Sequence, residues 1–174
     1  MNDDIINNKN VTDFIIVAND FCFHIEKIDS NTTAAFLFNY LQKVLPLLYI
    51  KASLLPYVEV DVNKAIRFLN DEEFEEIINM CLPITGNNDI YNDIVNNFND
   101  DRILKWSMAH NIASIYRELK DFLLLFSKDS IDIKKSAVLE VKKNFEMSWG
   151  ETLLRLHRAI HSRLYLHLYN YNIN

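Results

Sequence analysis

The stretch AAFLFNYLQKVLPLLYIKASLL (Ala34–Leu55) decides the fold. Drawn as a helix, it is apolar around most of its circumference, which is typical of a central, buried helix rather than of a surface one. Ser30, Asn31 and Thr32 precede it and offer a cap for its N-terminus. Pro46 lies inside the stretch and predicts a kink or a break there. We therefore expect a helical bundle built around this segment.

The composition places this helix in a single all-α domain. Of the 174 residues, 49 % are hydrophobic and 24 % are charged, the mix of an ordinary globular domain. Only two Gly and three Pro occur, where average usage gives about twenty together. Sandwiches, barrels and Gly-rich phosphate loops need frequent turn residues, so this scarcity argues against them. A net charge of −6 argues against nucleic acid and anionic membranes as partners.

Helical periods recur along the rest of the chain. We expect one domain over residues 1–174, a bundle of about five to seven helices with two long C-terminal ones and a frayed start at residues 1–10. The stretch from Pro83 to Asp101 is rich in polar residues, which predicts loops around one short helix at Ile90–Phe98. The other expected helices cover Thr12–Ile28, Ala34–Leu55, Asp61–Asn70, Asp71–Cys81, about Ile103–Phe126 and a last region from Ser130 to about Tyr169, in which Gly150 is a candidate interruption.

The N-terminus and the cysteines bear on the compartment. The first residues, MNDDIINNKNV, have neither the basic flank nor the apolar run of a signal peptide. The unbroken apolar runs are too short to span a bilayer. Cys22 and Cys81 lie in apolar patterns without CxxC spacing, which predicts buried, reduced thiols. We therefore expect a cytoplasmic protein.

Four stretches spread over most of the chain carry a family resemblance: FIIVANDFCFHIE (Phe14–Glu26), LPLLYIKASLLP (Leu45–Pro56), ASIYRELKDFLLLF (Ala113–Phe126) and NFEMSWGETLLRLHRAIH (Asn144–His161). Together they resemble an uncharacterised bacterial family that is common in Bacteroidetes and is classed as a domain of unknown function. The resemblance implies a compact all-α domain and implies no activity. The segment from about Asn87 to Met108 departs from the family pattern, so nothing is carried over to it.

Lys51 is the first candidate for chemistry, together with Glu140. It shares a helix face, the one expected to be most deeply packed, with Phe36, Tyr40, Val44, Leu47, Leu54 and Leu55. A buried ammonium must pair with a carboxylate or lose its proton. The functional interpretation is a catalytic or ligand-binding lysine; the structural one is a packed stem whose head meets an acid, and Glu140 is one available acid. We expect a mostly buried Lys51 with a carboxylate within hydrogen-bond reach.

His157 and His161 are candidate metal ligands. Because they lie four residues apart, they project from adjacent turns of one helix face, as metal ligands do. Arg158 stands where a zinc protease has its general-base Glu, which removes that mechanism. His157 also falls in an apolar stripe, so a histidine of the core is the stronger interpretation. His167 lies on the other flank of the stripe and is a poor third ligand.

The final segment, Glu151–Asn174, is basic in an otherwise acidic chain and carries interleaved tyrosines. Arg and Tyr are enriched at protein interfaces, so this segment is a candidate docking surface for a protein partner or a second copy. The alternative is a solvated face whose arginines cover apolar surface with their stems. The candidate partner-binding residues are Arg155, Arg158, Arg163, Tyr165 and Tyr169.

Two further patterns have structural interpretations. Gly150, beside Trp149, is expected to let another helix approach closely. The acids Asp89, Asp93 and the pair at 100–101 lack the spacing of a calcium loop, which favours a solvated loop.

No signature of a nucleophilic serine or cysteine and no phosphate-binding loop occurs, and we expect no cofactor and no resident metal. The sequence favours a non-catalytic cytosolic interaction or regulatory module, which could act as a homodimer. The alternatives are an enzyme or a ligand-binding protein with a pocket near Lys51 and His157, and a structural accessory domain.

Overall fold

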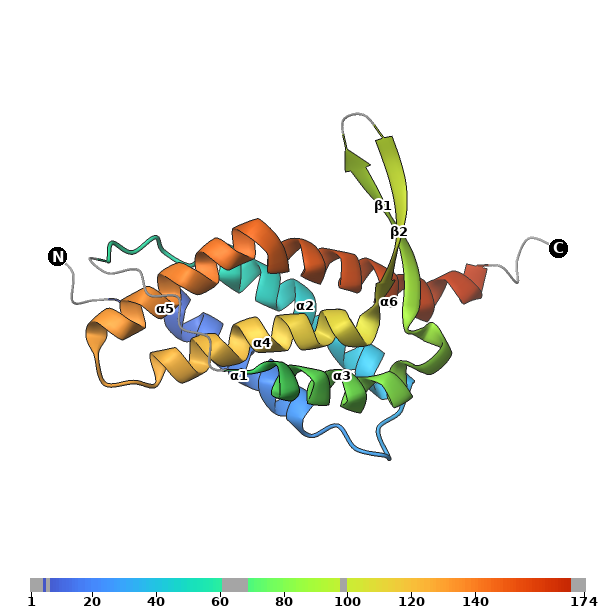
Figure 1. Cartoon of the computed structure of the whole chain (residues 1–174), viewed down its shortest axis with the longest axis horizontal. Helices are drawn as coiled ribbons and strands as arrows, with labels where there is room; N and C mark the ends of the chain where they lie inside the picture. The colour runs from blue at the N-terminus through green and yellow to red at the C-terminus, as the bar shows by residue number, and fades with distance from the viewer. Residues whose placement is uncertain (1–4, 6, 61–68, 98–99, 170–174) are drawn as a thin grey trace.

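Six α-helices and one β-hairpin make up the described part of the chain, as Figure 1 shows. The computed structural model describes residue 5 and residues 7–60, 69–97 and 100–169. The helix expected at 61–70 therefore lies almost wholly outside the described residues. The elements are α1 (Lys9–Glu26), α2 (Ala34–Ser53), α3 (Asp71–Thr85), a 3-10 turn η1 (Gly86–Asn88), β1 (Ile90–Asn97), β2 (Asp100–Ser107), α4 (Met108–Phe126), α5 (Ile131–Asn144), a π-helical turn η2 (Phe145–Trp149) and α6 (Gly150–Tyr169).

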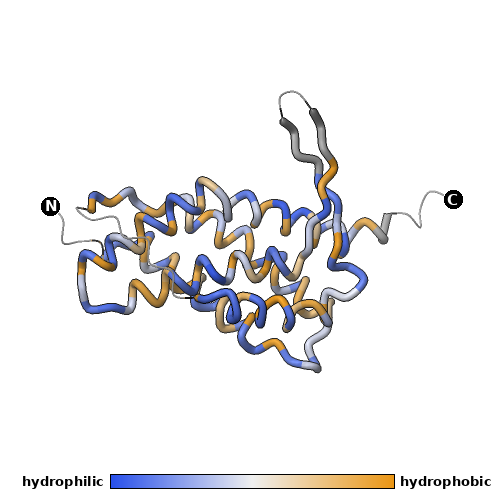
Figure 2. The backbone as a smooth tube through the Cα atoms, in the orientation of Figure 1, coloured by the Kyte–Doolittle hydropathy of each residue, from blue (hydrophilic) through white to orange (hydrophobic). Residues whose placement is uncertain are grey.

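These elements confirm the all-α class and the two long helical regions at the C-terminus. Figure 2 shows hydrophobic and hydrophilic residues following each other along every helix, which is the pattern of elements with one buried face. Within the described residues, no helix combines the length and the apolar character needed to cross a membrane. Cys22 and Cys81 are free thiols inside the bundle, as predicted, and burial raises the pKa of each to about 12.

The centre of the bundle is α4 rather than α2. α4 packs against α1, α3, α5 and α6, whereas α2 packs chiefly against α1 and α6. Ile112, Ile115 and Leu119 of α4 are completely buried. The prediction of a central Ala34–Leu55 helix is therefore wrong in its placement, although α2 itself forms almost as predicted and continues unbroken through Pro46.

The face of the second helical segment that carries Val44, Leu47 and Leu55 was expected to be the most deeply packed, and this is correct for Val44 and Leu55 but wrong for Leu47. Leu47 is 48 % exposed, and Phe36, Ile50 and Leu54 are exposed along the same side of the helix. The two faces of α2 are similarly apolar, so periodicity alone does not tell which one turns inward. The buried face carries Leu37, Leu41, Val44, Leu45, Leu48 and Ala52.

Side-chain caps set the starts of the N-terminal helices. The Asn8 side chain accepts hydrogen bonds from the backbone N–H groups of Asn10 and Val11, so α1 begins at Lys9 rather than after Thr12. Residues 9 and 10 are thus helical rather than frayed. α3 begins with a reciprocal capping box between Asn70 and Glu73.

The helix expected at Ile90–Phe98 does not form, because residues 90–97 are strand β1. β1 pairs antiparallel with β2, with Tyr91 opposite Trp106 and Ile94 opposite Ile103. The long helix expected from Ile103 consequently starts five residues later, at the beginning of α4. β-Branched and aromatic residues favour strands over helices, and the Asn and Asp residues of this segment favour turns in the place of the missing Gly and Pro.

Gly150 serves its own helical turn and not the approach of another helix. Gly150 follows the last residue of η2, and its N–H donates a hydrogen bond to the carbonyl oxygen of Phe145, the first residue of η2. A hydrogen bond between residues five positions apart is the pattern of a π-turn. A Cβ at position 150 would lie 2.6 Å from the Phe145 carbonyl oxygen and 2.9 Å from its ring. The helical region from α5 to α6 therefore runs through the candidate interruption because residue 150 lacks a side chain.

Replacing Gly150 by Ala is expected to lower the free energy of unfolding by about 1–2 kcal/mol. The crowding at Phe145 costs about 1–3 kcal/mol, which outweighs the gain of about 1 kcal/mol in helix propensity. Urea denaturation measures the change. Glu76→Ala on the exposed face of α3 is the matched control and should change stability by less than about 0.5 kcal/mol. A Gly150→Ala protein more stable than the parent would contradict the crowded turn.

Candidate functional site

The hairpin of β1 and β2, here called the hairpin arm, projects from the helical body beside the C-terminal half of α6 (Figure 1). Its base is held by Arg155 of α6. The Arg155 guanidinium carbon lies 3.8 Å from the centre of the Trp106 ring, and its Nε lies 3.9 Å from Asp93 Oδ2. Only 8 % of the Arg155 side chain is exposed. The residue predicted to bind a partner is thus buried between α6 and the arm.

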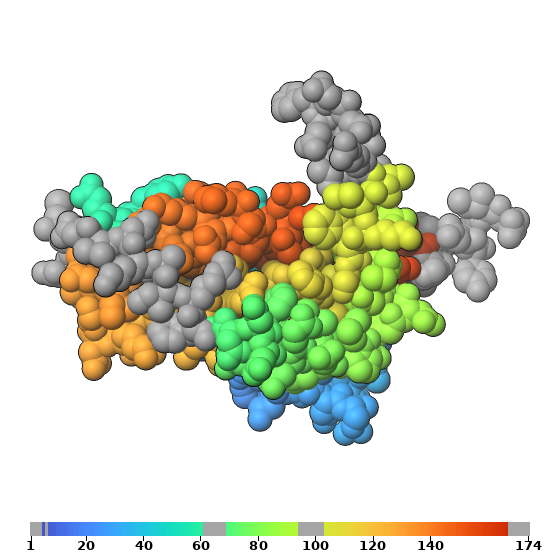
Figure 3. All heavy atoms as spheres, viewed as in Figure 1, coloured from blue at the N-terminus to red at the C-terminus, as the bar shows by residue number. Residues whose placement is uncertain are grey.

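Two more arginines of α6 bind the arm on its β1 side. Arg158 forms an ion pair with Asp93, and Arg163 Nη2 donates to the Ile90 carbonyl oxygen at 3.1 Å. The base of β2 packs against the start of α4, and the stacking of Arg155 on Trp106 joins it to α6; Figure 3 shows these segments next to one another. We call these three residues, Arg155, Arg158 and Arg163, the arginine clamp. Their ion pairs and hydrogen bonds are made within the molecule.

The arm is also anchored to the start of α4. Asp89 is buried, and its Oδ1 accepts from Thr85 Oγ1 at 2.9 Å and from the Ala109 N–H at 2.8 Å. A carboxylate at a helix N-terminus satisfies N–H groups that lack partners within the helix and is favoured by the helix dipole. Asn111 donates to the Tyr91 hydroxyl, and burial raises the pKa of Tyr91 to about 12. The expectation that Asp89 and Asp93 lie in a solvated loop is wrong.

The described surface of the arm carries exposed apolar side chains. Ile103 is 69 % exposed and Leu104 next to it is exposed, and Ile90 at the base is 53 % exposed. Next to it, a groove of about 490 Å³ runs between the start of β1 and α6, with Tyr91, Arg158 and Leu166 among its lining residues. The arm and this groove are the part of the described surface where apolar side chains, arginines and strand backbone occur together.

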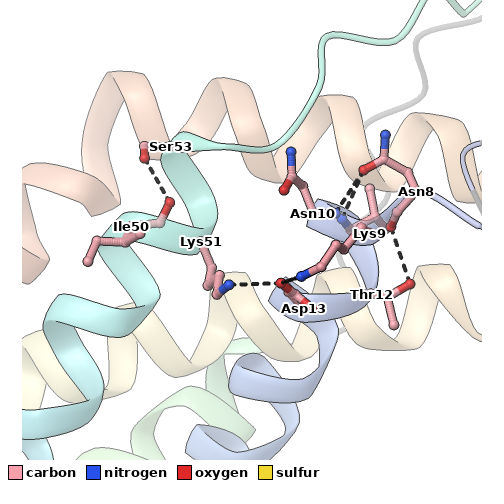
Figure 4. Close-up of polar contacts among 9 residues, drawn as sticks. Asn8, Lys9, Asn10, Thr12, Asp13, Ile50, Lys51 and Ser53 are labelled. Carbon is pink, nitrogen blue, oxygen red and sulfur yellow. Dashed lines mark hydrogen bonds and ion pairs between the residues drawn. The ribbon is translucent and has the colours of Figure 1, made fainter.

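Lys51 pairs with Asp13 of α1 (Figure 4). Its Nζ lies 2.8 Å from Asp13 Oδ2, and Lys9 Nζ reaches the same oxygen at 2.9 Å. The side chain of Lys51 is 27 % exposed, so it is mostly buried, as expected. The hydrogen bonds from Lys51, and next from Lys9, hold the pKa of Asp13 below its ordinary value. The expected carboxylate is present, but it is Asp13 and not Glu140.

Glu140 lies elsewhere, beside a small cavity between α4 and α5. The cavity has about 20 Å³, the room of one water molecule, and is also lined by Glu118, Asp121 and Asn144. Asp121 Oδ1 accepts from the Leu69 N–H at 2.9 Å. This arrangement joins the start of α3 to α4 and α5, and it does not bring Glu140 to Lys51.

The two histidines of α6 have different surroundings. His157 Nε2 lies 3.2 Å from the Gln42 carbonyl oxygen, while His161 is exposed with its ring 4.8 Å from the Tyr165 ring. Tyr165 donates to Gln42 Oε1 at 2.7 Å. In the part of the chain that the structure describes, no three His, Cys, Asp or Glu residues are grouped to hold a metal ion. The side chains of residues 167 and 169 lie outside the described ones.

Sequence reasoning found the three arginines but missed the residues they hold, Asp93 and Trp106. The signal was present in the β-branched and aromatic residues Tyr91, Ile94 and Val95, and in the run Ile103, Leu104 and Trp106, which are typical of strands. Had the hairpin been predicted, the basic residues of α6 would have been the expected partners of Asp93 and Trp106.

Comparison with known proteins places the chain in a family. The profile of a domain of unknown function (DUF5063) matches residues 5–166, so the chain belongs to this family and the predicted resemblance is confirmed. The crystal structure of protein BF1032 from Bacteroides fragilis, a structural genomics target, is similar in fold. It has a TM-score of 0.81 and 28 % sequence identity, over 92 % of this chain and 96 % of that chain. Comparison with curated proteins gave no match.

Replacing Lys51 by Met is expected to return the pKa of Asp13 toward its ordinary value, because the largest stabilisation of the carboxylate is lost. A depressed carboxyl pKa stabilises the fold above the ordinary pKa and ceases to do so as the pH falls through the lowered value. The stability deficit of Lys51→Met should therefore shrink in acid. Carboxyl NMR titration measures the pKa; Lys9→Met is the control and should shift it less.

Replacing Arg155 by Met is expected to loosen the base of the arm while keeping an apolar stem of similar length. Loss of the stacked, paired guanidinium should speed amide exchange at residues 90–93 and 104–107 about tenfold or more, with α1 and α2 unaffected. Arg117→Met is the matched control, since Arg117 stacks 4.1 Å from the Phe74 ring centre, away from the arm. Unchanged exchange in the arm of Arg155→Met would contradict the clamp.

Proposed function

We propose that this member of the DUF5063 family is a non-catalytic protein-interaction module whose docking element is the hairpin arm. The observation that carries the proposal is the exposure of Ile103 on a two-stranded ribbon that projects from the helical body. An isolated two-stranded hairpin is marginally stable in water, and further strands or a packed face are needed to stabilise it. A partner that pairs with the arm would supply a further strand and a packed face.

The arginine clamp, which holds the base of the arm, also supports the proposal. Burying the Arg155 side chain has a desolvation cost, and the stacking on Trp106 and the contact with Asp93 offset it. This contact fixes the direction in which β1 and β2 leave the body. A docking element held in its binding geometry loses less entropy when it binds.

The alternative of an enzyme or ligand-binding pocket near Lys51 and His157 receives less support. The ring of His157 lies at Gln42, nine residues before Lys51 along α2, which amounts to about 13 Å of helix. Lys51 is engaged by Asp13, and His157 by a backbone carbonyl. The two candidates therefore do not share one site.

Site-specific photo-crosslinking in cells that produce the chain natively tests the proposal. A benzophenone amino acid in place of Ile103 is expected to give a protein adduct on irradiation, because that position lies in the docking element. The same amino acid in place of Met147, which is also highly exposed, is the matched control and should give none.

Two outcomes would contradict the proposal. Without an adduct from position 103, the arm is not a docking element, and the structural accessory domain becomes the better interpretation. An adduct from position 47 on α2 in place of position 103 would move the interface to the exposed stripe of that helix.

A further inference from the structure

We infer that the groove between β1 and α6 is a binding site for a small organic carboxylate, whose charged group is held by Arg163. This site would be separate from the docking role proposed for the hairpin arm. The groove has a volume of about 490 Å³, which is within the range of pockets that hold small molecules. A space of this size has room for an organic body beside the charged group.

The two walls of the groove come from segments far apart in the sequence. Besides Arg158, α6 contributes four residues that lie within about two turns of the helix: Ala159, Ser162, Arg163 and Leu166. β1 contributes Tyr91 and Asn92. Arg163 joins the two walls, since its Nη2 donates to the Ile90 carbonyl oxygen at 3.1 Å. The groove is therefore held in shape by a contact within the molecule.

The groove is apolar at its floor and polar above it. Tyr91 and Ala159 are buried, so an aromatic ring and a methyl group form the floor. Arg158 and Leu166 are more than half exposed and mark the rim. Ser162 and Arg163 are half-buried. A ligand in this space meets apolar surface with its body and hydrogen-bond donors with its charged end.

The arginines at the groove carry more positive charge than the acids that pair with them. Arg155 and Arg158 share the carboxylate of Asp93. Arg163 forms no ion pair with any residue that the structure describes, and its hydrogen bond to Ile90 goes to a neutral carbonyl oxygen. A guanidinium has several N–H donors in a planar fork, and this bond uses one of them. Donors of Arg163 are thus left to bind an anion.

The electrostatic field at the floor of the groove is also positive. Burial raises the pKa of Tyr91, and the charges of Arg155 and Arg158 partly oppose this rise. Both guanidinium groups are therefore close enough to act on a charge at the floor. A negatively charged ligand gains from the same field, although the chain as a whole has a net charge of −6.

Charge balance favours a carboxylate over a phosphate. Among the three arginines, Arg163 is the one that lacks a carboxylate partner in the described part of the chain, so a single negative charge completes the pairing. A carboxylate supplies that charge, whereas a phosphate monoester carries about −1.5 to −2 near neutral pH. A planar carboxylate also matches the fork of a guanidinium. The Ser162 hydroxyl, which lines the same groove, is a further donor for it.

Titration of the full chain with cinnamate, followed by amide NMR shifts, tests the inference. Cinnamate should shift residues 91–92 and 158–166 and bind with a Kd of about 1–5 mM, as expected for a ligand of this size. Cinnamamide has nearly the same shape without the charge and should bind about tenfold more weakly or less. No shift in the groove with cinnamate, or equal binding of the two compounds, overturns the inference.

Two variants at position 162 change the charge of the groove and leave Arg163 with its bond to Ile90 in place. Ser162→Asp should weaken cinnamate binding about tenfold or more, because the new carboxylate repels the ligand and competes for the arginines. Ser162→Asn is the matched control, since it adds a side chain of similar size without charge, and it should change the Kd by less than about threefold. Equal affinities of the two variants would contradict the site.

Arg163→Met tests the residue that holds the charged group. It should weaken cinnamate binding about tenfold or more and leave the weaker cinnamamide binding unchanged. Arg117→Met is the control, because Arg117 stacks on Phe74 away from the groove, and it should bind cinnamate like the parent. Undiminished cinnamate binding by Arg163→Met overturns the assignment.

Two phosphate compounds test the class of ligand. Phenyl phosphate should bind no more tightly than cinnamate, and inorganic phosphate at the same concentration should not shift the residues of the groove. Tighter binding of phenyl phosphate would replace the carboxylate by a phosphate as the ligand. Inorganic phosphate binding as well as cinnamate would show a site for anions in general. Either result overturns the organic carboxylate.

Discussion

The buried contact of Arg155 with Trp106 and Asp93 is the constraint on which the functional architecture depends. A guanidinium taken out of water must be stacked or paired, and Arg155 is both. The contact crosses from the last helix to a hairpin about fifty residues earlier in the chain. It fixes the base of a ribbon that would be only marginally stable alone.

The base of the arm is continuous with the core. β2 leads directly into α4, which is the helix with the most neighbours in the bundle, and the Asp89 carboxylate accepts hydrogen bonds both from Thr85 at the end of α3 and from the first turn of α4. One buried carboxylate thereby ends the preceding turn, starts the central helix and sets the origin of β1. The packing of the bundle and the placement of the arm therefore depend on the same buried residue.

The sequence predicted well whatever depends on local periodicity and capping. α2 agrees with its prediction to within two residues, and the acids after Asn70 begin α3 as expected. The hairpin was missed because residues 90–98 were predicted as a short helix and residues 103–107 as the start of a long one, although their β-branched and aromatic residues favour strands. The inward face of α2 was missed because a helix apolar on both sides does not specify its orientation. The partner of Lys51 was missed because Asp13 lies 38 positions away, and only the fold brings it near.

The arginines illustrate why residue enrichment alone does not locate an interface. The contact between α6 and the hairpin has the chemistry of a protein–protein interface, with arginines, an aromatic ring and a paired acid, but both sides belong to one chain. The exposed apolar stripe of α2 differs from the arm in the state of its backbone groups. Its apolar side chains face solvent, yet its backbone groups are bonded within the helix, so exposure there leaves only hydrophobic contacts to be gained. A hairpin edge also offers backbone hydrogen-bonding groups to a partner strand, which adds the specificity of a register to the hydrophobic contact.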